Sequence, residues 1–285
     1  MDDLERLASE FVAKTQREGR RLALVTSGGT RVDLEKNAVR FIENFSMGNR
    51  GAASSEYFLE QGYAVIFFYR EGSLKPFSRR APNLFDRLKL DRNGRAILES
   101  DPETDRAVAG HLKYSDQIMY PTFVTVDEYL HGLEVICRQV NRMGANALIY
   151  LAAAVSDFYI REEQLPTHKI QSQGGDVQLS LSVVTKILDR LVEAVVPKSF
   201  VVSFKLETDP EILISKAKGA LKRYKHSLVI GNILKTRKTT VVFVQADSVD
   251  DLTLTPEQQQ AGVEIERLIV ERLHKKHDEF VSKST

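Results

Sequence analysis

Short apolar runs with the composition of β-strands recur along this chain, and stretches with helical patterns separate them. Most of the runs are nearly continuous rather than alternating, which is typical of parallel strands covered on both faces. Strand and helix in regular alternation predict a doubly wound, mostly parallel α/β sheet with helices on both faces. The expected strands are Leu22–Thr26, Ala64–Tyr69, Ala147–Leu151, Phe200–Phe204, Leu228–Ile230 and Val241–Val244. The expected helices are Asn49–Gln61, Val126–Met143, Val184–Ala194, Pro210–Tyr224 and Pro256–His277.

Two polar stretches interrupt this pattern. Leu90–Gln117 is charged and weakly periodic, which predicts an inserted loop, or a helix followed by a loop. Ile160–Gly175 ends in paired glycines and has the composition of a mobile, lid-like loop. We therefore expect one domain over residues 1–285, with an insertion at about 90–118 and a lid at about 160–175. Right-handed crossovers would place a ligand at the carboxyl ends of the strands.

Composition limits the class of protein. A formal charge of +1 over 285 residues gives no reason to expect a general nucleic-acid or membrane surface, so any anion site must be local. Cys137 is the only cysteine, which rules out an internal disulfide and suits a reducing compartment. It lies in an apolar helical run, so we expect a buried, inert thiol. The acidic N-terminus lacks the pattern of a secretory signal, and we expect a cytoplasmic protein.

The segment VRFIENFSMGNRG, residues 39–51, carries several polar groups just before a predicted helix. The start of a helix attracts phosphate or carboxylate because its N–H groups are unpaired. Arg40 could hold an anion through two hydrogen bonds, and Asn44 could donate to an acyl oxygen without carrying charge. Gly48 and Gly51 could let a ligand approach the backbone. A plain turn between strand and helix explains the composition about equally well.

Two strand ends could also hold a ligand. The run LVTSGGT ends in Gly28 and its neighbours, on whose backbone a phosphate or ribose could lie, although an ordinary turn explains it better. The run LAAAVSD ends in small residues that leave room for a ligand, followed by Asp157, which could accept from a hydroxyl or amide. Close packing, with Asp157 as a helix N-cap, is the competing interpretation.

Three further residues stand out at loops and strand ends. Lys169 in the expected lid could stabilise charge at a phosphorus atom, although a loop lysine is usually only solvated. Phe204 could flank a nucleobase or simply fill the core, while Thr208 or Asp209 caps the helix that starts at Pro210. Asn232 could contact a base edge beside the basic turn at residues 235–238, or it could belong to a turn with a solvated basic hairpin. Zinc spacing and a Gly-x-Ser-x-Gly elbow are both absent from the sequence, which favours chemistry with held phosphates and Mg²⁺.

Taken in order, these segments resemble the eukaryotic type of phosphopantothenate–cysteine ligase of coenzyme A biosynthesis. The resemblance implies a Rossmann-like fold, a homodimer with a shared site, and a Mg²⁺-dependent reaction with ATP or CTP through an acyl-nucleotide intermediate. A separate protein would perform the decarboxylation that follows. The motifs that carry the resemblance are VTSGGT, VRFIENFSMGNRGA, GYAVIFFYREGS, LAAAVSDF, HKIQS, SFKLETD and GNILKTRK.

The resemblance also implies roles for individual residues. Asn44 would stabilise the acyl-nucleotide, and Lys169 would assist its formation. Arg40 would reach the phosphopantothenate of the neighbouring subunit. The residues implied to contact the pantothenate part are Ala153, Ala154 and Asp157. Those implied to line the nucleotide are Gly28, Ser46, Gly48, Gly51, Phe204 and Asn232.

The chain departs from the family pattern in two places, and two other functions fit parts of it. Met47 stands where many members have serine, and Lys169 is the single lysine between Arg161 and Gly175. An NAD(P)-binding oxidoreductase would share the sheet, but the three-glycine fingerprint is missing. A non-catalytic regulatory relative would keep the fold, but the presence of both Asn44 and Lys169 argues against it. The choice between CTP and ATP, and the metal ligands, stay open.

Overall fold

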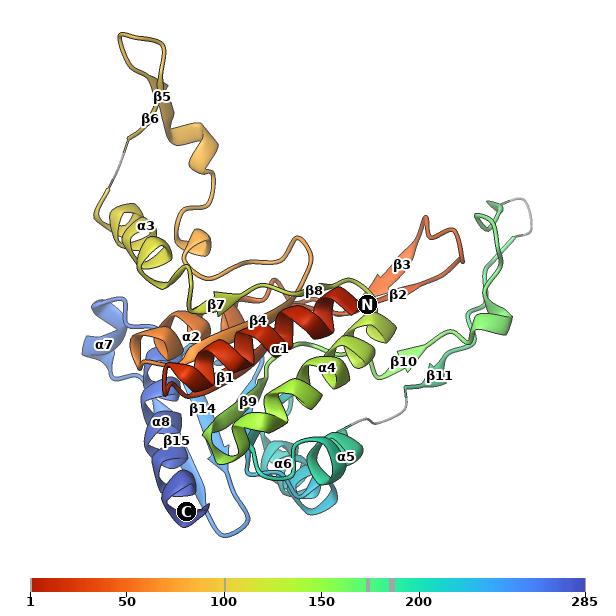
Figure 1. Ribbon diagram of the computed structural model, residues 1–285. Coiled ribbons are helices and arrows are strands. Elements are labelled where there is room, and N and C mark those ends of the chain that lie inside the picture. The colour runs from red at the N-terminus through yellow and green to blue at the C-terminus, as the bar shows by residue number, and fades with distance from the viewer. Residues whose placement is uncertain (1, 100, 173–174, 185–187, 285) are drawn as a thin grey trace.

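The computed structural model describes residues 2–99, 101–172, 175–184 and 188–284 (Figure 1). Within these residues, the central sheet has nine strands in the order β15-β14-β13-β12-β9-β1-β4-β7, and β8 also pairs with β4. The strand pairs β13–β12, β12–β9, β9–β1, β1–β4, β4–β7 and β4–β8 are parallel. The pairs β13–β14 and β14–β15 are antiparallel. The strands are β1 (Leu22–Ser27), β4 (Ala64–Arg70), β7 (Ile118–Met119), β8 (Thr122–Phe123), β9 (Ala147–Leu151), β12 (Phe200–Glu207), β13 (Leu228–Ile233), β14 (Thr240–Val244) and β15 (Val249–Thr253).

All six predicted strands are confirmed, and so is the doubly wound, mostly parallel sheet. They are recognisable because they are covered on both faces; every residue of β1 is buried, for example. The strands of the central sheet that the prediction missed lie at its borders. β7 and β8 have two residues each, and β15 is a mostly exposed strand that contains Asp250 and Asp251. Neither kind of strand leaves an apolar run in the sequence.

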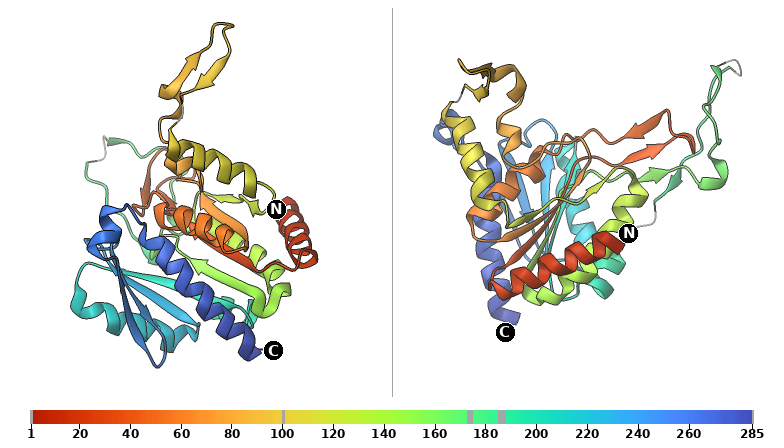
Figure 2. Two further views of the ribbon diagram at one scale, coloured as in Figure 1. Left: turned by 90° about the vertical axis from the view of Figure 1, so that its left-hand side faces the viewer. Right: turned by 45° about the horizontal axis from the view of Figure 1, so that its top comes forward.

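Helices cover both faces of the sheet (Figures 1 and 2). Helices α2 (Asn49–Glu60) and α8 (Ile265–Ser284) share a core with one face. Helices α1 (Asp2–Arg17), α4 (Val126–Val140) and α6 (Pro210–Tyr224) pack on the other. The predicted cap of α6 is confirmed, since the Asp209 carboxylate accepts from Glu211 N at 2.9 Å. No helix among the described residues is long and apolar enough to span a membrane.

Two predicted helices differ from the structure. In place of one helix over Val184–Ala194 there is a short α5 (Leu188–Arg190) and a π-helical turn at Leu191–Val195, and residues 185–187 lie outside the described part. The predicted helix Pro256–His277 is two helices, α7 (Pro256–Gln260) and α8. It breaks near Gly262, whose φ of +68° is left-handed and cannot continue a helix.

The insertion is more ordered than predicted. It contains a hairpin of β5 (Leu88–Leu90) and β6 (Ala96–Leu98), which projects from the molecule in Figure 1, and helix α3 (Pro102–Tyr114). The Asp91 carboxylate turns the hairpin by accepting from the N–H groups of Asn93 and Arg95, both at 2.8 Å. Such local hydrogen bonds from short polar side chains replace apolar periodicity as the signal for structure.

Two arms project from the carboxyl edge of the sheet (Figure 2). We call the hairpin of β2 (Arg31–Asp33) and β3 (Phe41–Glu43) the first arm. The second arm is the segment between β10 (Phe158–Tyr159) and β11 (Ser182–Val183), which contains the predicted lid. The arms lie side by side, because Lys36 N and Asn37 N on the first donate to carbonyls of the second at 2.9 and 3.1 Å.

Candidate active site

A cavity of about 1230 Å³ opens at the carboxyl ends of β9, β12 and β13, where the topology predicts a ligand. Residues from distant parts of the chain line it, and eight of the twelve predicted site residues are among them. These eight are Asn44, Ser46, Gly48, Ala153, Ala154, Asp157, Phe204 and Asn232. Met47 lines the cavity as well, and its large exposed fraction of 55% leaves its side chain largely in solvent.

Asn44 is held against the turn that follows β9. Its Nδ2 donates to Val155 O at 3.2 Å, and its Oδ1 accepts from Ser156 Oγ at 3.2 Å. Its backbone N–H donates to Thr30 O at 3.3 Å, and Thr30 N in turn donates to Ala154 O at 3.1 Å. An amide nitrogen has two hydrogens, so one remains for a ligand in the cavity. Asn44 is therefore a fixed, uncharged donor at the cavity wall.

The turn after β9 is fastened to β1 through its backbone. Ala153 N donates to Thr26 Oγ1 at 3.2 Å, and Ala154 N donates to Gly28 O at 2.8 Å. Asp157 is exposed and is followed by β10, so the competing interpretation of Asp157 as a helix cap is wrong. The small alanine side chains leave this edge of the cavity open, and Asp157 supplies a carboxylate there.

Glycines allow close approach of the backbone at the end of β1, to α2 at Gly51 and to β4 at Gly28. A Cβ at Gly51 would lie 2.5 Å from Ser27 Oγ, and one at Gly28 would lie 2.6 Å from Arg70 Cβ. Gly48 precedes α2 with a φ of +81°, in the left-handed region that favours glycine. Among the described residues that line the cavity, neither Gly28 nor Gly51 occurs. Close approach of protein atoms thus accounts for these two glycines, and their contact with a nucleotide stays a prediction.

Phe204 and Asn232 lie on one face of the sheet near the cavity. The Phe204 ring packs edge-on against Tyr150, with centroids 4.9 Å apart. Asn232 is buried, and its Oδ1 has no hydrogen-bond partner. A buried acceptor without a partner is costly, so this position suits a ligand that donates a hydrogen bond. Asn232 lies inside β13 rather than at its end as predicted, and the basic turn follows two residues later.

Arg50, on the first turn of α2, is a cavity residue that the sequence analysis missed. Its Nη1 pairs with Glu266 Oε1 at 3.0 Å, and its Nη2 donates to Arg237 O at 2.6 Å. Its guanidinium carbon lies 5.9 Å from the centre of the Phe204 ring. Burial raises the pKa of Glu266, although Arg50 opposes that shift. The signal in the sequence is its place inside the glycine motif, between Gly48 and Gly51.

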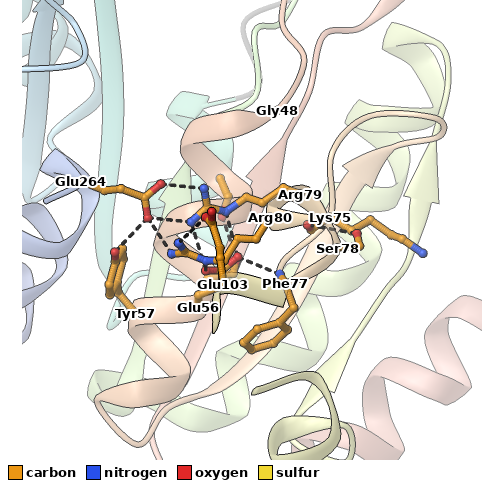
Figure 3. A network of polar contacts seen from close by, with 12 residues as sticks. Gly48, Glu56, Tyr57, Lys75, Phe77, Ser78, Arg79, Arg80, Glu103 and Glu264 are labelled. Atoms are coloured by element: carbon orange, nitrogen blue, oxygen red, sulfur yellow. Dashed lines mark hydrogen bonds and ion pairs between the residues drawn. The ribbon is translucent and has the colours of Figure 1, made fainter. Parts of the chain in front are cut away.

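Close to the cavity, a network of charged side chains joins α2, the turn at 78–80 and the start of α8 (Figure 3). Arg79 and Arg80 lie between Glu56 and Glu264, with N–O distances of 2.6 to 3.0 Å. Tyr57 Oη also donates to Glu264, at 2.9 Å. Burial acts against ionisation of Glu264, but the two arginines and Tyr57 outweigh it and lower its pKa to about 2. We call these residues the arginine clamp.

Arg40 and Lys169 lie on the two arms instead of in the cavity. Arg40 pairs with the fully buried Glu35 at 3.2 Å and donates from Nη2 to Ile170 O at 2.5 Å. Burial opposes ionisation of Glu35, but the N–H groups of Arg40, Val39 and Ile170, with the Arg40 charge, lower its pKa. Lys169 is exposed. The arms thus hold each other and carry both basic residues away from the cavity of the same chain.

Other candidate groups have no place in the site. Cys137 is completely buried in α4 and burial raises the pKa of its thiol, which confirms the predicted inert cysteine. His168 is exposed on the second arm. No group of three His, Cys, Asp or Glu side chains in the described ranges is placed to hold a metal ion. Mg²⁺ commonly binds through substrate phosphates, water and one or two carboxylates, and exposed Asp157 is a carboxylate of that kind.

Comparison with known proteins points to one enzyme family. The model of the DNA/pantothenate metabolism flavoprotein C-terminal domain matches residues 116–269. The human phosphopantothenate–cysteine ligase is 43% identical over 284 residues, which cover 96% of this chain and 91% of the human protein. The ligase CAB2 of Saccharomyces cerevisiae is 37% identical over 311 residues, covering 100% and 84%. A solved structure of a Cab2 H337A mutant in complex with phosphopantothenate-cysteine superposes with a TM-score of 0.90 at 39% identity, covering 99% and 95%.

Proposed function

Since this chain belongs to the phosphopantothenate–cysteine ligase family, we propose that it joins 4′-phosphopantothenate to L-cysteine through an acyl-nucleotide made from ATP or CTP. The observation that supports this best is the cavity, which brings eight predicted site residues together at the carboxyl edge of the sheet. Family membership argues against the alternative of an NAD(P)-dependent oxidoreductase.

The reaction has two displacements. The carboxylate oxygen of phosphopantothenate attacks the α-phosphorus of the nucleotide, and the bond to the β-phosphate breaks to release pyrophosphate. The cysteine amine then attacks the acyl carbon and loses a proton, and AMP or CMP leaves with the bond electrons. Because two polyanions must meet, most of the catalysis is positioning and charge neutralisation. Mg²⁺ bound to the triphosphate would supply part of that neutralisation.

The cavity divides into two ends for these partners. Asn44, held against the turn after β9, faces the acyl-nucleotide, and Ala153, Ala154 and Asp157 contact the pantothenate part beside it. At the other end, Phe204 and Asn232 flank the nucleotide. The Asn232 Oδ1 atom has no hydrogen-bond partner in the protein and can accept a hydrogen bond from a polar group of the nucleotide. Ser46 and Gly48 at the start of α2 suit its phosphates, because a helix N-terminus attracts anions.

The two arms support a homodimer with a shared site. Arg40 and Lys169 are basic residues suited to phosphate, yet they lie on the arms and not among the described cavity-lining residues. The arms also expose apolar side chains, including Phe41, Phe158 and Val183 at 46%, 51% and 64%. We propose that each arm pair reaches the cavity of the partner subunit, where Arg40 binds phosphopantothenate and Lys169 stabilises charge at the α-phosphate.

A direct assay tests the proposed reaction. The protein is incubated with phosphopantothenate, cysteine, Mg²⁺ and either ATP or CTP, and pyrophosphate and the amide product are measured. We expect equal amounts of both products, and no pyrophosphate when phosphopantothenate is omitted. Release of pyrophosphate that does not need phosphopantothenate, or no product with either nucleotide, would contradict the proposal. The ratio of kcat/KM for ATP and CTP gives the nucleotide preference.

A further inference from the structure

Arg50 and Glu266 form an ion pair in the wall of the cavity, at the end proposed for the nucleotide. Both residues line the cavity, and their side chains are only 15% and 12% exposed. An ion pair that is so well shielded from water destabilises the fold unless its remaining polar atoms also form hydrogen bonds. Arg50 meets that condition through its second hydrogen bond, to Arg237 O. The pair therefore joins three segments, namely the start of α2, the turn between β13 and β14, and the start of α8.

The same guanidinium also faces the Phe204 ring. Phe204 contacts both Tyr150 and Arg50, at 4.9 Å between the Phe204 and Tyr150 ring centres and 5.9 Å from the Phe204 ring centre to the guanidinium carbon. Ile230 pairs with Phe204 across the two strands, so Asn232, two residues later, lies on the same face of the sheet. Arg50 thus contacts both the Phe204 ring, which shares this face of the sheet with Asn232, and the turn at Arg237, which follows Asn232 in the sequence.

Glu266 has a rigid support. It lies two residues after Glu264, which the arginine clamp holds through three hydrogen bonds from Arg79 and Arg80 and one from Tyr57. The clamp fixes the start of α8 against α2, the helix that also carries Arg50 (Figure 3). The carboxylate of Glu266 therefore presents a fixed acceptor to Arg50, whose planar guanidinium bonds to it through Nη1 and to Arg237 O through Nη2.

We propose that Arg50 is a positioning residue for the nucleotide, which orients the Phe204 ring and the turn at Arg237 and Lys238 through its bond to Glu266. This inference rests on the proposed function, because it needs the nucleotide to bind at this end of the cavity. Its consequence is selective: the affinity for the nucleotide depends on the Arg50–Glu266 pair, whereas the affinity for phosphopantothenate does not.

The test compares Arg50→Gln, Glu266→Gln and the double variant in the full-length protein. We expect Arg50→Gln to raise the Kd for ATP or CTP, measured by calorimetry, about tenfold, and to leave the KM for phosphopantothenate within about twofold. Glu266→Gln should have a smaller effect in the same direction. The double variant should raise the Kd no further than Arg50→Gln alone, because both single changes break the same ion pair. Arg267→Gln is the matched control, because Arg267 follows Glu266 in α8 and forms an exposed ion pair with Glu271.

Two outcomes would overturn the inference. One is a folded Arg50→Gln protein with wild-type nucleotide affinity, and the other is an equal loss for both substrates, which indicates a merely structural role. Should Arg50→Gln fail to fold, Glu266→Gln decides by the same criteria, since it keeps the size and one acceptor of the native side chain. Wild-type protein that binds neither nucleotide contradicts the proposed function instead, so the two failures can be told apart.

Discussion

The cavity and the two arms both carry predicted site residues, but they are built in different ways. The cavity residues sit on backbone that the sheet fixes: Asn44, for example, bonds to the turn after β9, which is itself bonded to β1. The arms share a small apolar cluster, in which Val32 and Ile160 pack with Val126 of α4, and they also contact each other directly. The central contact is the buried Glu35, whose carboxylate binds Arg40 and three backbone N–H groups.

This difference suggests a division of labour. A preformed cavity lowers the ordering cost of binding two substrates, whereas the arms present charge that is held ready outside it. The reaction would then start only when arm and cavity come together. The four predictions that follow test this division, in order of the expected effect.

Asn44→Asp should separate the two steps within the cavity. The carboxylate cannot donate to the acyl oxygen, so amide formation should fall about 10²- to 10³-fold while pyrophosphate release continues. Rapid-quench measurement of both products checks this. Asn93→Asp, the same change in the exposed hairpin of the insertion, is the control. Unchanged amide formation would remove Asn44 from its proposed role.

Mixing two inactive variants should show whether the arms act across subunits. Arg40→Ala and Asn44→Ala should each lose about 10²-fold in activity. After subunit exchange, about half of the dimers are mixed, and each mixed dimer has one site with both native residues. We therefore expect recovery to about a quarter of the wild-type rate. A mixture that stays as inactive as its components would mean that arm and cavity of the same chain work together.

Gly51→Ala should test the close packing of α2 against β1. Alanine favours helix, but here its Cβ would lie 2.5 and 2.6 Å from Ser27 Oγ and Cβ. The crowding should lower the free energy of unfolding by about 1–3 kcal/mol. Gly219→Ala in α6 is the control with the opposite sign, since a Cβ there meets nothing within 4 Å and should stabilise by about 0.5–1 kcal/mol. Urea unfolding curves measure both, and equal values would contradict the close approach.

Acid should weaken the sheet before it weakens the arms. Burial lowers the pKa of His277 and of His226 to about 4, so the unfolded chain binds protons more readily and stability falls as the pH drops from about 6.5 to about 4. Each histidine contributes at most roughly 1.4 kcal/mol per pH unit. The pKa of Glu35 is lowered in the folded protein, so ionised Glu35 stabilises the arm contact at every pH above the ordinary carboxyl pKa. That stabilisation is lost only as the pH falls below the ordinary carboxyl pKa.

Unfolding measured by urea at several pH values checks this order. His277→Gln should show a shallower loss of stability between pH 6.5 and 4 than the wild type. Amide exchange of Ile170 and Arg40 reports on the arm contact in the same range. Arms that separate at a higher pH than the one at which the sheet weakens would contradict the prediction.

The sequence allowed the sheet to be predicted because its strands are buried on both faces and therefore leave continuous apolar runs. It allowed most of the cavity to be predicted because Ala153, Phe204 and Asn232 follow or end such runs. The glycines were predicted for a reason that is only part of the explanation, since Gly51 also allows α2 to approach β1 and Gly28 allows the end of β1 to approach Arg70 of β4. The residues that were missed depend on distant partners: Arg50 pairs with a glutamate 216 positions away. Arg40 and Lys169 lie outside the cavity because of how the arms fold, and no local sequence pattern predicts that fold.

The borders of the sheet have a consequence for assembly. An open strand edge invites another chain to add its own strand, which leads to aggregation or fibres. Here one border is β15, where Asp250 and Asp251 add charge and Asp251 O already accepts from Arg272. The opposite border is broken into the two-residue strands β7 and β8. Strand addition is thereby discouraged on both sides of the sheet.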